Sequence, residues 1–159
     1  MQAVVMENKM DTNLVEKMKT VLADSFAFAL KAQYFHWNVE GPNFLQYHDL
    51  FGKIYEEVQD SIDHIAEQIR TLDAYAPGSF SRFLQLTTIQ DEIYFPLAMK
   101  MVEQLYSDNQ IVLKNLNEAF KAADSVNNQG LADFLSGRID IHSKHAWFLR
   151  ATLKGSKNV

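Results

Sequence analysis

One apolar stripe dominates the sequence between residues 44 and 72. Its large side chains recur at steps of three or four residues: Phe51, Ile54, Val58, Ile62, Ile65, Ile69 and Leu72. Steps of this size place side chains on one face of an α-helix. Because no segment shows the two-residue alternation of a strand, the stripe is expected to pack on other helices. This helix is predicted to begin at Asn43 or Phe44, and Ala76, Pro77 and Gly78 are expected to end it.

Three other segments carry the same helical periodicity. They run from Leu14 to about Asn38, from near Pro96 to about Ala123, and from Leu131 to Leu153. The aromatic side chains of the last two helices are expected in the core. The whole chain, residues 1–159, is predicted to be a single domain with flexible tails at about 1–12 and 154–159.

A long connection separates the second and third of these helices. It covers residues 75–95 and contains a short apolar piece with Phe80, Phe83, Leu84 and Leu86, which is predicted to form a small helix. A connection this long is uncommon in a compact helical domain, but it lets two helices of a four-helix bundle run parallel. The sequence therefore predicts an all-α four-helix bundle with one long crossover.

Composition excludes several classes of protein. The 159 residues include no cysteine, which excludes disulfides, thiolate zinc sites and cysteine nucleophiles. No apolar run approaches the roughly 20 residues of a membrane span, and the first residues lack the pattern of a secretory signal, so a cytoplasmic protein is expected. The net charge of −5 argues against broad nucleic-acid binding and favours cations.

Two histidines and two carboxylates form a candidate metal site. His36 and His48 are twelve positions apart, and Asp63 and Glu67 lie one helical turn apart on the second helix. Such ligands suit iron, zinc or manganese. On one continuous helix His48 and Asp63 are about 22 Å apart along the axis, which no single ion spans. If these residues share a metal, the carboxylates come from a second copy packed across a two-fold axis.

Other interpretations of these residues stay open. A histidine on a helix is more often packed or exposed than ligating, and an acidic helix flank is more often solvated. His142 and His145, three apart on the last helix, favour packing, because His142 lies on the apolar face and only Asp140 is an acidic neighbour in sequence. None of the five histidines has a Glu three positions before it, which excludes a di-iron centre built from Glu-x-x-His motifs within one chain.

Four stretches of sequence resemble the Dps family, the DNA-binding proteins from starved cells, a branch of the ferritin superfamily. The resemblance covers about Leu14 to Leu153. Its motifs are His36-Trp37-Asn38-Val39-x-Gly41-Pro42-x-Phe44, His48-x-Leu50-Phe51-x-x-x-Tyr55, Asp63-x-x-Ala66-Glu67-x-Ile69-Arg70-x-Leu72, and Lys144-His145-Ala146-Trp147-Phe148-Leu149-Arg150-Ala151.

The resemblance implies a ferritin-like bundle assembled as a hollow dodecamer of tetrahedral symmetry. It implies a ferroxidase centre at each two-fold interface, with His36 and His48 from one subunit and Asp63 and Glu67 from its partner. Ferrous iron would be oxidised there, typically by hydrogen peroxide, and stored as ferric mineral. Trp37 would lie beside the site as a possible electron source.

The chain departs from the family pattern at three places. Gly52 stands where members often carry a supporting carboxylate, so a weaker second iron position is expected, and the site holds one iron or two. Asp124 and Asp133 match the region of an acidic three-fold pore, but Asn128 and Gln129 between them are neutral. The tails lack the lysine-rich sequence used by DNA-binding members, so weak or no DNA binding is expected.

Three functions therefore remain from the sequence. The first is a ferroxidase and iron-storage cage that protects against oxidative damage. The second is a DNA-protecting or structural cage with a weak ferroxidase site. The third is a helical metal-binding bundle without redox chemistry.

Overall fold

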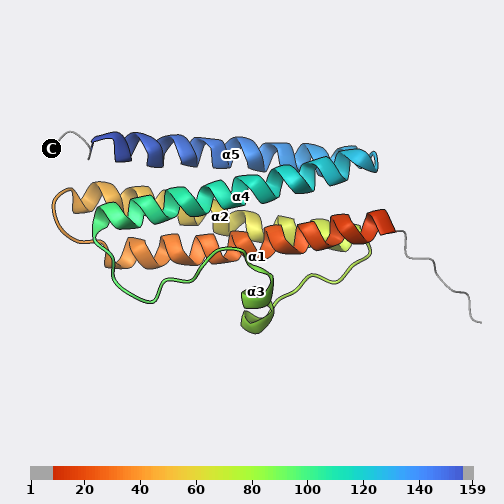
Figure 1. Cartoon of the computed structure of the whole chain (residues 1–159), viewed down its shortest axis with the longest axis horizontal. Helices are drawn as coiled ribbons and strands as arrows, with labels where there is room; N and C mark the ends of the chain where they lie inside the picture. Colours follow the sequence, from red (N-terminus) through yellow and green to blue (C-terminus); the bar gives the residue numbers. More distant parts are fainter. Residues whose placement is uncertain (1–8, 156–159) are drawn as a thin grey trace, which may run out of the picture.

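The structure is a computed structural model that describes residues 9–155. Four long helices lie side by side, and a short fifth helix sits beside them (Figure 1). The helices are α1 (Lys9–Asn38), α2 (Phe44–Thr71), α3 (Phe80–Leu86), α4 (Ala98–Ser125) and α5 (Gln129–Lys154). The predicted all-α four-helix bundle is confirmed, and so is the short helix inside the crossover. None of these helices is long and apolar enough to cross a membrane.

The crossover sets the direction of the helices. It returns along the bundle from the end of α2 to the start of α4, so that α2 and α4 run parallel while α1 and α5 run the opposite way (Figure 1). α1 packs against both α2 and α4, and α5 packs against α4. The predicted use of the long connection, a parallel second and third helix, is confirmed.

The core lies along the inward faces of α1, α2, α4 and α5. Its largest fully buried side chains are Phe28, Phe35, Phe51, Leu14, Met18, Leu22, Ile54, Ile65, Ile69, Met101, Leu105 and Leu116. The stripe on α2 therefore faces inward as its spacing predicts, with Ile62 and Leu72 partly buried at its margin. The prediction that Trp147 on α5 lies in the core is wrong, because its side chain is 56% exposed.

The helix ends differ from the sequence prediction by a few residues. α1 already begins at Lys9, so residues 9–12 are helical, and the rest of the two expected tails lies almost wholly outside the described residues. α2 ends at Thr71 because Asp73 takes a left-handed φ of 59°, before the Pro77–Gly78 signal. Gly41, with φ of 99°, supplies the turn between α1 and α2.

Buried polar groups fix the crossover onto the bundle. The Asp24 carboxylate on α1 accepts hydrogen bonds from the backbone N–H of Thr88 at 2.7 Å and from the Nδ2 of Asn115 at 2.6 Å. Lys31 Nζ, also buried, donates to Asp108 Oδ2 at 2.7 Å and to the carbonyl of Gln90 at 2.6 Å. These contacts join three segments distant in sequence, so the crossover has one defined path along α1 and α4.

Candidate metal centre

His36 and His48 hold each other in place across the α1–α2 turn. His36 Nδ1 lies 2.6 Å from the carbonyl oxygen of His48, and His48 Nδ1 lies 2.7 Å from the carbonyl oxygen of His36. A carbonyl only accepts, so each Nδ1 carries the hydrogen and donates it. In the neutral imidazole, Nε2 then keeps its lone pair. Backbone carbonyls that fix the tautomer and orientation of an imidazole in this way are typical of metal-ligating histidines.

The two imidazole rings are stacked. Their centroids are 3.7 Å apart, and the ring planes differ by only 20°. A metal binds an imidazole nitrogen in the ring plane at about 2.0–2.1 Å. Because near-parallel planes at this separation do not meet at that distance, the two Nε2 lone pairs address two neighbouring positions rather than one.

Gly52 lies directly beneath the His36 ring. A Cβ atom at residue 52 would be 3.1 Å from both Cε1 and Nδ1 of His36, closer than ordinary van der Waals contact. The Tyr55 ring meets the same imidazole edge-on, with centroids 5.2 Å apart. The absence of a carboxylate at position 52 thus matches the structure, because the His36 ring packs against the backbone of Gly52, where a side chain would begin.

Asp63 and Glu67 are exposed and lie far along α2 from His48. All three belong to one continuous helix, so the axial separation of His48 and Asp63 is about 22 Å at 1.5 Å per residue. Asp63 lines a hollow of about 540 Å³ whose other walls include Leu30 of α1 and Phe83 of α3. Within the part of one chain that the structure describes, no three His, Asp or Glu side chains converge as a metal site.

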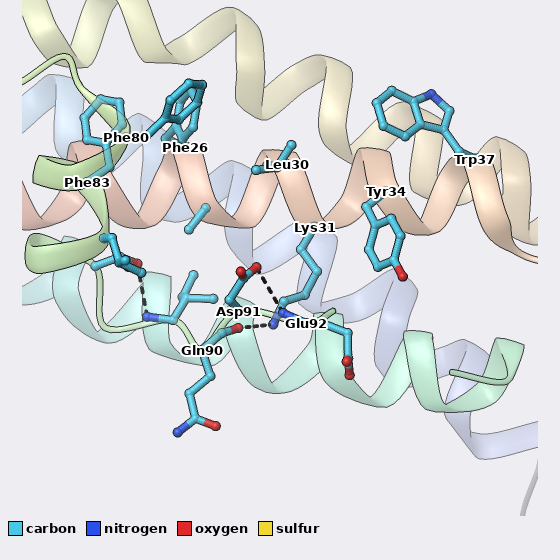
Figure 2. A pocket seen from close by; sticks show the side chains of 14 residues that line it. Phe26, Leu30, Lys31, Tyr34, Trp37, Phe80, Phe83, Gln90, Asp91 and Glu92 are labelled. Carbon is cyan, nitrogen blue, oxygen red and sulfur yellow. Dashed lines mark hydrogen bonds between the residues drawn. The ribbon is translucent and has the colours of Figure 1, made fainter. Parts of the chain in front are cut away.

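Trp37 points away from the bundle beside a second hollow. This hollow of about 420 Å³ runs along α1 between Trp37 and the short helix α3, and Phe26, Leu30 and Phe80 line it (Figure 2). Trp37 is 62% exposed and Phe80 is 82% exposed. We call Leu30, Trp37, Phe80 and Leu84 the α1–α3 face. An exposed apolar surface of this kind, next to Asp63, is typical of a protein–protein contact.

Comparisons with known proteins give the family. The ferritin-like domain family matches residues 15–158. DNA protection during starvation protein 2 of Bacillus anthracis is 31% identical over 144 residues, which cover 91% of this chain and 99% of that protein. The chain belongs to the Dps family of ferritin-like proteins.

Two further comparisons find similar proteins. An uncharacterized low temperature-induced protein of Nostoc sp. (strain PCC 7120) is 39% identical over 136 residues, which cover 84% of this chain and 76% of that protein. The crystal structure of Dps from Vibrio cholerae, described as a member of a broad superfamily of ferritin-like diiron-carboxylate proteins, matches with a TM-score of 0.87. Its identity is 27%, and the match covers 91% of each chain.

In this Dps chain the interior between α2 and α5 holds an ion-pair network. Glu57 forms a two-pronged ion pair with the Arg138 guanidinium, and His145 Nε2 lies 3.0 Å from Glu57 Oε2. Partial burial acts to raise the pKa of Glu57, but the hydrogen bonds from His145 and Arg138 outweigh it and lower the pKa to about 2. Sequence reasoning missed Glu57, and the predicted packing role fits His142 and His145.

His142 is buried in its neutral form. Its Nδ1 lies 2.7 Å from Asn109 Oδ1, which only accepts, so Nδ1 carries the hydrogen. Nε2 then faces the Arg138 guanidinium at 3.3 Å. Burial, and next the nearby Arg138 charge, lower the pKa of His142 to about 3 from 6.5. This nitrogen accepts from an arginine, so it is not offered to a metal.

The burial of neutral His142 predicts a pH-dependent stability. Between pH 6.5 and about 3 only the unfolded chain protonates this histidine, so the stabilisation is complete above pH 6.5 and falls as the pH falls. Compared with wild type, His142→Gln should reduce the slope of unfolding free energy against pH by up to about 1.4 kcal/mol per pH unit. Urea unfolding at fixed protein concentration between pH 7 and 5 measures it. Gln110→Ala, which replaces an exposed side chain that has no titratable group, should keep the wild-type slope. Equal slopes for His142→Gln and wild type would contradict the prediction.

The two candidate pore residues lie at the far end of the Dps bundle from the histidine pair. Asp124 is in the last turn of α4 and Asp133 in the second turn of α5, and both are exposed. Neutral Asn128 caps α5 by accepting from the Leu131 N–H at 3.2 Å. These aspartates remain pore candidates, placed on either side of the α4–α5 turn.

Proposed function

We propose that this Dps-family protein is a ferroxidase that oxidises ferrous iron with hydrogen peroxide and stores the ferric product inside a dodecameric cage in the cytoplasm. The site would comprise His36 and His48 of one subunit and the Asp63 and Glu67 side chains of its two-fold partner. The reciprocal hydrogen bonds of the histidine pair carry the proposal, because they leave two fixed Nε2 lone pairs at one place on the surface.

The position of the carboxylates supports a shared site. Asp63 lies at the margin of an exposed apolar surface that includes Leu30 of the α1–α3 face. If two copies pack antiparallel through this surface, the carboxylate end of each α2 meets the histidine end of the other. The separation that prevents one chain from closing the site is then the separation that a two-fold axis bridges.

The ligands suit the chemistry of iron oxidation. Imidazole nitrogen and carboxylate oxygen both bind iron, and the negative carboxylates favour the more highly charged ferric product. Each ferrous ion gives up one electron and hydrogen peroxide accepts two, so two ferrous ions are consumed for each peroxide reduced to water. With stacked rings, His36 and His48 would each serve one of two neighbouring iron positions, and Gly52 adds no third ligand.

A direct assay tests the proposal. The protein is loaded with ferrous iron under anaerobic conditions, hydrogen peroxide is added, and ferric absorbance is followed against a protein-free control. Rapid oxidation with about two ferrous ions consumed per peroxide is the expected result. Oxidation no faster than in buffer would contradict the ferroxidase assignment and leave a storage or structural cage.

DNA protection is the second candidate function. It is favoured by the printed names of relatives such as the Bacillus anthracis and Brevibacillus brevis proteins, both DNA protection during starvation proteins. The charge of this chain opposes it. The net charge is −5, and the first twelve residues carry Lys9 against Glu7 and Asp11. Phosphate binding depends on Lys and Arg, so the folded cage should repel DNA.

Weak DNA binding is therefore a testable expectation. At neutral pH and about 150 mM salt, a gel shift with linear duplex DNA should show no retarded complex at micromolar cage. The variant Glu7→Lys/Asp11→Lys reverses the charge balance of the N-terminal segment and should bind at low salt. Tight binding by the wild-type protein at 150 mM salt would overturn this expectation and favour the DNA-protecting function.

A further inference from the structure

Three potential metal ligands gather around one arginine inside the bundle. Glu57 of α2 contacts both the Arg138 guanidinium and His145 of α5. His142 of α5 contacts the same guanidinium, and we call Glu57, His142 and His145 the inner site. Arg138 and the two histidines are between 1% and 7% exposed, so the cluster is shielded from water. The inner site shares no residue with the proposed ferroxidase centre.

The arginine nitrogen Nη2 lies between the ligand atoms. It is 3.2 Å from Glu57 Oε2 and 3.3 Å from His142 Nε2. The same Glu57 oxygen is 3.0 Å from His145 Nε2. Because the guanidinium shares its positive charge among its nitrogens, a cation already occupies the space between a carboxylate oxygen and an imidazole nitrogen.

The two histidines of the inner site are oriented as metal ligands are. Their rings meet at 86° with centroids 5.5 Å apart. Two perpendicular rings can direct their in-plane lone pairs at one point, which the stacked rings of His36 and His48 cannot do. His142 is also fixed from behind, because its Nδ1 donates to Asn109 Oδ1 at 2.7 Å. An outer hydrogen bond of this kind is typical of metal-ligating histidines.

The residue types match a known class of metal site. Two histidines and one glutamate bind zinc with a water molecule in the fourth position, and helical bundles build such sites between facing helices. Metal–ligand distances are about 2.0–2.2 Å, so each side chain would move inward by about 1 Å from its present contact with the arginine. The Glu57 side chain is 31% exposed, so it has room to move and lies where an ion would enter.

We propose that the inner site is a site for a divalent transition-metal ion, which the Arg138 guanidinium fills and closes in the native chain. A guanidinium keeps its charge at every pH at which proteins are folded, and its attachment to α5 favours it over a free ion. Within the described residues no three His, Asp or Glu side chains converge as a metal site, as expected when a guanidinium stands between them. The closure confines transition metals to the surface of the chain, and it holds independently of the proposed function.

Replacing Arg138 with alanine should open the inner site to cobalt(II). All proteins in this test carry His36→Ala/His48→Ala, so that the proposed ferroxidase centre contributes no metal binding. With Arg138→Ala, about one cobalt ion per chain should bind and give the strong visible absorption of a four-coordinate site. The parent protein should show no such absorption. Neither should Arg150→Ala, the matched control that removes an exposed arginine of the same helix.

Removal of single ligands identifies the side chains that bind cobalt. Adding His142→Gln or Glu57→Gln to Arg138→Ala should weaken cobalt binding at least about tenfold. Adding Ser143→Ala, at an exposed position of α5, should leave it unchanged. Cobalt binding by the parent as tight as by Arg138→Ala, or a folded Arg138→Ala without the strong absorption, would overturn the proposal.

Thermal unfolding keeps the test decisive if Arg138→Ala is unstable. Removing one partner of a buried ion pair is destabilising, and an ion that binds only the folded chain offsets this loss. Zinc should therefore raise the unfolding midpoint of Arg138→Ala, or restore its helical circular dichroism if the metal-free variant is unfolded. It should do neither for Arg138→Ala/His142→Gln. The absence of any zinc effect on Arg138→Ala would overturn the proposal, and because no iron oxidation is measured, failure of the proposed function is recognised separately.

Discussion

Replacing both His36 and His48 with alanine is expected to lower the rate of peroxide-driven ferrous oxidation by at least about 100-fold, to the rate in buffer. Loss of groups that merely orient metal ligands already costs 10–100-fold in metal affinity or activity, and here the ligands themselves are removed. Both imidazoles present a free Nε2 because their Nδ1 atoms donate to carbonyls at 2.6 and 2.7 Å. Stopped-flow ferric absorbance, with the assembly mass checked, gives the measurement.

Two further variants separate ligation from folding. His36→Gln/His48→Gln keeps side chains that donate hydrogen bonds but removes the imidazole lone pairs, so it should be as inactive as the alanine variant. Asn38→Ala removes a polar side chain two residues from His36 that donates to the Tyr34 carbonyl, and it should keep near-wild-type activity. A double histidine variant that oxidises iron as fast as the parent, in an intact cage, would show that the site is elsewhere.

The sequence was sufficient for the helices because their stripes are long and regular. The apolar positions of α2 between Phe51 and Ile69 predicted the buried face, and the length of the crossover predicted the parallel α2 and α4. The end of α2 was placed too late, because Asp73 adopts a left-handed conformation that the sequence only weakly indicates. Trp147 was assigned to the core because helical spacing does not separate a buried aromatic from one on an exposed groove.

Contacts between helices that are distant in sequence could not be predicted from the sequence. Glu57 reaches Arg138 and His145 across separations of 81 and 88 residues, and no local periodicity encodes such a pair. The reciprocal bonding of His36 and His48 depends on the exact turn at Gly41, whose φ of 99° brings the two histidines together. The separation of His48 and Asp63, in contrast, could be predicted from the sequence, because the rise of a helix shows that one chain cannot close the site.

A mixing experiment should restore activity from two inactive proteins. The His36→Ala/His48→Ala variant lacks the nitrogen ligands and the Asp63→Asn/Glu67→Gln variant lacks the carboxylates, so each cage alone should be inactive. When equal amounts are dissociated and reassembled, half of the two-fold pairs are mixed. In each mixed pair one of the two sites combines the unaltered histidines of one chain with the unaltered carboxylates of the other. About a quarter of all sites should therefore be active.

The recovered fraction discriminates between the possible locations of the site. A site held within one chain would give no recovery at any mixing ratio, since every chain carries one defect. A site shared across the two-fold axis should give recovery that is greatest at equal amounts and falls to zero at either extreme. Reassembling each variant with itself provides the matched control, and mass spectrometry of the mixed cages establishes that the two chains co-assemble. His48 and Asp63 lie at separate places on the single helix α2, so one chain cannot complete the site by itself. Better folding of either variant in the mixture would therefore not reproduce the dependence of activity on the mixing ratio.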